Sequence, residues 1–166
     1  METFTLVAAL IAAIGLAAII AKLSERRNNR QLGLPLTFQP CDDGNLHFDH
    51  IRLKAAFDGD LILTYRVTNT TNHIIRASLI YEDFFTLRIL NDRLPGSLTS
   101  TPTSICLLPG DNCDCEQMFL LSNWRRDCGL SRRTPLPDMC APDRWTLICE
   151  TTGQPLAATT AHPEGA

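Results

Sequence analysis

The N-terminal apolar run constrains this chain most. The residues from Thr3 to Ala21 include no charged side chain. As an α-helix rising 1.5 Å per residue, such a run would be about 28 Å long, close to the hydrocarbon thickness of a bilayer. A cleaved signal peptide would have a basic start and a shorter apolar core, whereas this chain begins Met1-Glu2. We therefore predict an uncleaved single transmembrane helix over residues 1–22, with the lipid bilayer as its first partner.

Basic residues follow the apolar run directly. Lys22, Arg26, Arg27 and Arg30 lie just after it, and none precedes it. Because Lys and Arg favour the cytoplasmic side, the rule predicts a cell (inner) membrane protein with its soluble domain in the cytoplasm. Seven cysteines favour an oxidising compartment instead. A periplasmic or extracellular domain therefore stays as the alternative.

The apolar run has small residues at four-residue spacing. A helix would align Ala9, Ala13, Ala17 and Ala21 on one stripe, with Gly15 nearby. Such a stripe lets a second helix approach closely, so other integral membrane proteins are the predicted partners. Alanine is also a common helix former, and a bare anchor would have the same composition. The run contains no ionisable residue to serve as a cofactor ligand or proton relay, and we predict no cofactor.

The start of the run resembles the N-terminus of type IV pilins. Phe4-Thr5-Leu6 followed by an Ile-, Ala- and Gly-rich stretch matches that family's opening. Position 8 is Ala, where the family places a glutamate, and no basic leader precedes Phe4. The resemblance implies a pilin-like or pseudopilin-like filament subunit as an alternative function.

The rest of the chain reads as mainly β. Residues 23–45 are predicted as a juxtamembrane linker, 46–150 as a β-sandwich domain and 151–166 as a poorly packed C-terminal tail. Leu61, Leu63, Tyr65 and Val67 alternate with polar residues, as in a half-buried strand, after a turn at 58–60. No window shows a helical period. The predicted strands are 46–57, 61–68, 74–81, 84–90, 103–108, 116–121 and 144–150.

These features resemble an immunoglobulin-like sandwich. The segment 61–71 reads LILTYRVTNTT, a later LLPGD at 107–111 precedes an apolar strand and Trp124, and Trp145-Thr-Leu begins a closing strand. The order is similar to that of the bacterial intracellular proteinase inhibitor family. The resemblance implies an antiparallel immunoglobulin-like sandwich over 46–150 and no inhibitory activity, because no exposed reactive loop can be named.

The cysteines offer two kinds of chemistry. Cys113, Cys115, Cys128 and Cys140 are candidate ligands of a zinc ion or an iron–sulfur cluster, although a lone C-x-C matches the usual spacings poorly. A disulfide between Cys128 and Cys140 would instead close a loop rich in Pro and Arg. Cys113 and Cys115 are not expected to pair with each other. Cys106 and Cys149 lie in apolar strands and are expected to be buried.

Other polar groups have plainer interpretations. His47 and His50 would point to opposite faces of a strand, which argues against joint metal ligation. Arg125, Arg126, Arg132 and Arg133 form a basic loop that could contact an acidic partner or lipid headgroups, or simply be solvated.

The sequence contains no motif of a known catalytic site. It has no G-x-S-x-G, phosphate loop, dinucleotide fingerprint or H-E-x-x-H. A net charge of −3 argues against nucleic acid, and no small-molecule substrate is indicated. We predict a non-catalytic accessory subunit of a larger membrane complex, such as a respiratory or photosynthetic one. The alternatives are the filament subunit and a small membrane-anchored metal or redox protein.

Overall fold

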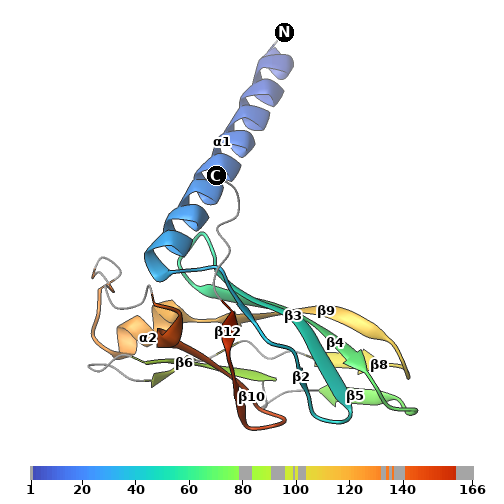
Figure 1. Cartoon of the computed structure of the whole chain (residues 1–166). Helices are drawn as coiled ribbons and strands as arrows, with labels where there is room; N and C mark the ends of the chain where they lie inside the picture. Colours follow the sequence, from blue (N-terminus) through green and yellow to red (C-terminus); the bar gives the residue numbers. More distant parts are fainter. Residues whose placement is uncertain are drawn as a thin grey trace.

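The computed structural model describes residues 2–78, 84–90, 96–98, 100, 104–131, 134, 136 and 141–159. A long helix, α1 (Glu2–Leu32), rises from a body of antiparallel sheets (Figure 1). Its apolar part makes it long and apolar enough to cross a membrane. The prediction of a mainly β chain behind one apolar N-terminal helix is confirmed.

The larger sheet is built around a long hairpin. Its path runs β12 (Ala158–Thr159), β1 (Leu36–Phe38), β3 (Leu46–Ala55), β4 (Leu61–Asn69) and β9 (Asn112–Phe119), and β2 (Cys41–Asp42) pairs with β3. Along β4 every second residue from Leu61 to Asn69 is buried. The predicted alternation is therefore confirmed, and Gly59, at φ +93°, supplies the turn that connects β3 to β4.

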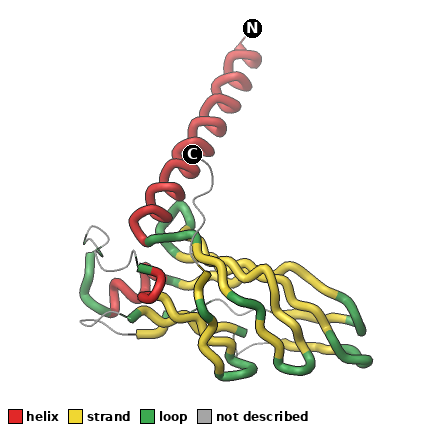
Figure 2. Tube along the Cα trace, in the orientation of Figure 1, coloured by secondary structure: helices red, strands yellow, loops and turns green. Residues whose placement is uncertain are grey.

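Two further sheets lie below the larger one (Figures 1 and 2). One has the order β11 (Gln154–Leu156), β10 (Trp145–Cys149), β6 (Phe85–Ile89), β7 (Gly96–Ser97). The other pairs β5 (Ile75–Ser78) with β8 (Ser104–Leu107). The predicted strand 74–81 is described only as far as Ser78. All pairings in the described part of the chain are antiparallel.

The core lies between the larger sheet and the β10–β6 pair. Phe48 on β3 packs edge-on against Phe85 on β6, with ring centroids 5.3 Å apart, and Tyr65 on β4 packs 4.9 Å from the same ring. Gln117 on β9 is fully buried and donates from Nε2 to the Phe85 carbonyl at 2.8 Å. Aromatic packing and one buried polar contact thus join the two layers.

Three predictions about local structure are wrong: that no helix follows the linker, that the tail from residue 151 is poorly packed, and that Cys106 is buried. A short helix, α2 (Leu121–Asp127), follows β9, and it buries Leu121 and Trp124. The tail region contributes β11 and β12, which pair with β10 and β1, so residues 154–159 belong to the fold. Cys106 is exposed, because Ile105 and Leu107 take the inward positions on β8. A 3₁₀ turn at Pro142–Arg144 precedes β10.

Candidate functional site

The end of α1 is built into the β-domain. Gly33 follows the helix at φ +67°, and the Leu34 amide donates to the Asn29 carbonyl at 2.8 Å, which is a Schellman ending. Leu32 and Leu34 are each only 6% exposed. The sequence predicted a linker over residues 23–45, but the helix continues to Leu32 and β1 begins at Leu36. The chain therefore passes from helix to sheet through three residues.

Two asparagines of α1 bind the turn between β3 and β4. The Asn29 side chain accepts from the Ala55 amide at 2.7 Å through Oδ1. The Asn28 side chain donates from Nδ2 to the carbonyls of Ala56 at 2.9 Å and Phe57 at 3.3 Å. Adjacent side chains on the helix thus bond to backbone groups of three consecutive residues, at the end of β3 and in the turn after it, which fixes the helix against the larger sheet.

The other sheet also contacts the helix end. The Trp145 indole, at the start of β10, donates from Nε1 to the Leu32 carbonyl at 3.2 Å. The carbonyls in the last turn of a helix have no partner within it, so this bond satisfies a group that would otherwise be buried without one. The end of α1 is therefore attached to both layers, and we call the set Asn28, Asn29, Leu32, Leu34 and Trp145 the junction.

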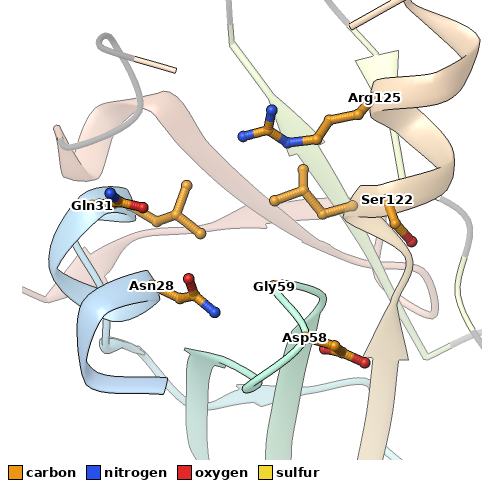
Figure 3. A pocket seen from close by; sticks show the side chains of 8 residues that line it. Asn28, Gln31, Asp58, Gly59, Ser122 and Arg125 are labelled. Carbon is orange, nitrogen blue, oxygen red and sulfur yellow. The ribbon is translucent and has the colours of Figure 1, made fainter. Parts of the chain in front are cut away.

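A small cleft adjoins the junction, between α1, the β3–β4 turn and α2 (Figure 3). Its volume is about 130 Å³, below the roughly 300–1,000 Å³ typical of small-molecule sites. Asp60 is buried and accepts from the Ser122 amide at 2.8 Å and from its hydroxyl at 3.1 Å. The carboxylate thereby caps the start of α2, which has no side-chain cap of its own. Of the polar residues that line the cleft, Ser122 is thus bonded to Asp60 and Asn28 to the β3–β4 turn.

Arg125, predicted as a partner contact, also has partners within the chain. Its Nη1 donates to the carbonyls of Ser131 at 3.0 Å and Thr134 at 2.9 Å, and burial lowers its pKa. Arg126 is exposed, with Nε 3.8 Å from an Asp127 carboxylate oxygen. Arg132 and Arg133 lie outside the described residues. Of the basic loop's described arginines, only Arg126 points its charge outward.

The apolar part of α1 is exposed, in contrast to the buried junction at its other end. Every residue from Leu6 to Ile20 is exposed, including Ala9, Ala13, Gly15 and Ala17 of the predicted packing stripe. Ala21, the last of the stripe, is half-buried beside the β3–β4 turn. The stripe is thus open to another helix along most of its length, and its role as a packing surface stays a prediction.

The described candidate metal cysteines, Cys113, Cys115 and Cys128, do not form a cluster. The Sγ atoms of Cys113 and Cys115 lie 3.5 Å apart, because β9 already begins at Asn112 and residues two apart share a strand face. Both remain free thiols, and the sequence predicts no disulfide between them. Burial, with the neighbouring Cys113 thiol, raises the pKa of Cys115 to about 12. Cys128 follows α2, beyond the far end of β9.

No group of three or more metal-ligating side chains occurs in the part of the chain that the structure describes. Cys140 lies outside the described residues, so the predicted Cys128–Cys140 disulfide stays a prediction.

Cys41 and Cys149 form a second pair of neighbouring thiols, which lies between the two layers of the domain. No pattern in the sequence predicts this pair. Cys41 on β2 lies opposite Phe48 on β3, in the larger sheet. Cys149 on β10 lies opposite Phe85 on β6. Because Phe48 and Phe85 pack together, their cysteine neighbours face each other, and the two thiols share a hydrogen bond. That bond raises the pKa of Cys41 and lowers that of Cys149, which also contacts the Thr151 hydroxyl at 3.1 Å.

The positions of His47 and His50 differ from those expected for a regular strand. A bulge between Asp49 and Arg52, with His50 at φ +52°, breaks the alternation of β3. His47 and His50 therefore both lie beside Asp49, with ring nitrogens 3.9 Å from its oxygens. His50 is exposed, His47 is half-exposed, and 3.9 Å exceeds hydrogen-bond reach.

Comparison with protein-family models, with curated proteins and with solved structures found no match.

Proposed function

We propose that the chain is a non-catalytic, single-pass membrane subunit that holds its β-domain at a fixed height and orientation beside a larger membrane complex. The observation that carries the proposal is the junction. Asn28 and Asn29 bind the β3–β4 turn, while the Trp145 indole donates to the Leu32 carbonyl at the end of α1. A tether needs only a flexible linker, whereas this helix end is ordered by both layers of the domain.

The exposed apolar surface of α1 supports a membrane location. Side chains such as Leu10 and Ile14, each 62% exposed, form part of a continuous apolar surface over residues 6–20. A soluble protein rarely exposes so large an apolar patch to water. Lipid covers such a helix on most sides, and the small stripe gives a partner helix its closest approach.

We also infer that the β-domain is an immunoglobulin-like sandwich. Two antiparallel layers facing each other across an aromatic core support this proposal. The sandwich would present its outer strand faces to a partner, and no catalytic role is proposed for it.

Complex formation is tested by gentle detergent extraction from native membranes, followed by native size analysis. We expect the chain to migrate with a larger complex, and a monomer would overturn the proposal. Substituting Ala9, Ala13 and Ala17 together by Leu should release it, because the added side chains keep a partner helix away. The matched control is Ile14→Leu with Leu16→Ile, which conserves volume and should leave the complex intact.

The side of the membrane is tested with a membrane-impermeant thiol reagent. Lys22, Arg26, Arg27 and Arg30 support a cytoplasmic domain. Cys106 is the reporter because it is exposed, and Cys149 is the internal control because it is buried. We expect Cys106 to be labelled only after lysis. Labelling in intact spheroplasts would place the domain outside and contradict this orientation.

A filament subunit is the second candidate, and the junction favours it too. A helix that continues into its domain without a linker would hold that domain rigidly on the surface of a filament. The mass of the mature N-terminus separates the two functions. A processed, methylated Phe4 supports the filament, and an intact Met1 excludes pilin-type processing.

A further inference from the structure

We propose that the β3–β4 turn is a lipid-binding element, in which Phe57 lies in the bilayer interface beside α1. This inference rests on the proposed function, because it requires that α1 spans a membrane. It adds a second point of contact between the chain and lipid, supplied by the β-domain itself.

The turn lies at the level where the apolar run ends. A groove of about 350 Å³ separates it from the helix. The helix lines this groove with Ala18, Ala21, Lys22 and Glu25, and the hairpin lines it with Lys54 to Phe57 and Ile62. Since the uncharged run of α1 ends at Ala21, a bilayer that covers the run has its headgroups at this groove.

Phe57 cannot withdraw into the domain. Its side chain is 62% exposed, and its carbonyl is held by the Asn28 side chain at 3.3 Å. The neighbouring Ala56 is buried and its amide donates to the Asp60 carbonyl at 2.7 Å, so the turn itself is fixed. A large aromatic side chain is thus kept on the outside of the domain, at the depth where aromatic residues are enriched in membrane proteins.

The charges around Phe57 suit a headgroup layer. Lys22 has an exposed side chain and lies 3.8 Å from Glu25, while Lys54 points from the outer face of β3 toward the same groove. Lysines at this level can reach lipid phosphates while their aliphatic stems cover apolar surface. An apolar tip beside two lysines, with Glu25 and Asp58 nearby, matches the mixed charges of the headgroup layer.

The test uses tryptophan as a depth probe in full-length protein reconstituted alone into phosphatidylcholine–phosphatidylglycerol vesicles. Three variants are compared: Phe57→Trp at the turn, Leu16→Trp within the apolar run, and Leu108→Trp at an exposed site on the loop after β8. Vesicles contain acyl chains brominated either near the headgroup or near the bilayer centre. The wild-type chain, whose Trp124 and Trp145 are buried, supplies the background.

We expect the tryptophan at position 57 to be blue-shifted and to lose fluorescence mainly to the shallow bromines. The fluorescence of the tryptophan at position 16 should be quenched mainly by the deep bromines. The fluorescence of the tryptophan at position 108 should be quenched by neither set of bromines. Quenching at 16 without quenching at 57 would overturn the lipid-binding turn and leave the membrane helix intact. Absence of quenching at 16 would instead overturn the proposed function on which the inference rests.

Discussion

The two ends of α1 have opposite relations to the rest of the molecule. From Leu6 to Ile20 every residue of the helix is exposed, and the exposed surface is apolar. From Asn28 to Leu32 it is polar on one side and buried on the other, and it bonds to both layers of the β-domain. One helix therefore has an exposed apolar part and a part that is built into the β-domain.

The largest expected effect comes from charging the exposed part. Ile11→Lys combined with Ile14→Lys places two ammonium groups in the middle of the apolar run, at about 2.5–3.5 kcal/mol each by insertion scales. We expect the double variant to leave the membrane fraction on alkaline carbonate extraction. Leu23→Lys, beside Lys22 at the end of the run, is the control and should stay. Retention of the double variant would contradict a membrane-spanning α1.

A buried leucine at the other end should matter for folding instead. Leu32→Ala removes a side chain packed in the core, which costs about 2–5 kcal/mol of unfolding free energy. Leu23→Ala, at an exposed site on the same helix, should change it by less than about 0.5 kcal/mol. Denaturant titration of the detergent-solubilised chain, followed by tryptophan fluorescence, measures both. Equal changes in unfolding free energy for the two variants would contradict the difference between the two parts of the helix.

The junction's hydrogen bonds should contribute less than its packing. Asn29→Ala leaves the amide of Ala55, a fully buried residue, without its acceptor, which costs about 1–3 kcal/mol. Asn29→Asp keeps an acceptor and should recover most of the loss, apart from about 0.3–1 kcal/mol for a negative charge near a helix C-terminus. The same titration tests this, and an Asn29→Asp variant as unstable as Asn29→Ala would show that the bond contributes little.

The smallest effect should come from the exposed pair on the outer face of the larger sheet. Arg66 donates from Nε to Asp114 at 2.9 Å and holds the pKa of that carboxyl below its ordinary value. A lowered folded-state pKa stabilises the domain above the unfolded pKa, and this is lost as pH falls through the folded pKa. Asp114→Asn should therefore be slightly less stable than wild type near neutral pH and equal to it in acid. A difference that grows in acid would contradict the pairing.

Local patterns explain which parts of the fold could be predicted. The length of the uncharged run to Ala21 predicts the membrane helix, and the alternation from Leu61 to Val67 predicts a strand. Helix α2 has seven residues, too few for a helical period to be visible. The bulge at His50 likewise depends on how β3 pairs with β4, which the spacing of two histidines does not reveal.

The junction and the thiol pair could not be predicted because their partners are far apart in sequence. Asn28 and Asn29 are poor helix formers after a basic stretch, which is typical of a linker, and their partners are backbone groups at 55–57. Cys41 and Cys149 meet only because Phe48 and Phe85 bring two sheets together. Tertiary contacts therefore decided the features that most bear on function.

The central claim is that α1 and the β-domain move as one body. Spin labels on non-cysteine unnatural side chains at Leu16 and Leu108, both exposed, give the distance distribution between helix and domain in lipid nanodiscs. The junction predicts a single narrow distribution, broadened when Asn28, Asn29 and Leu32 are all substituted by Ala. A broad distance distribution in the wild-type chain would contradict the claim. It would mean that α1 is only a flexible tether.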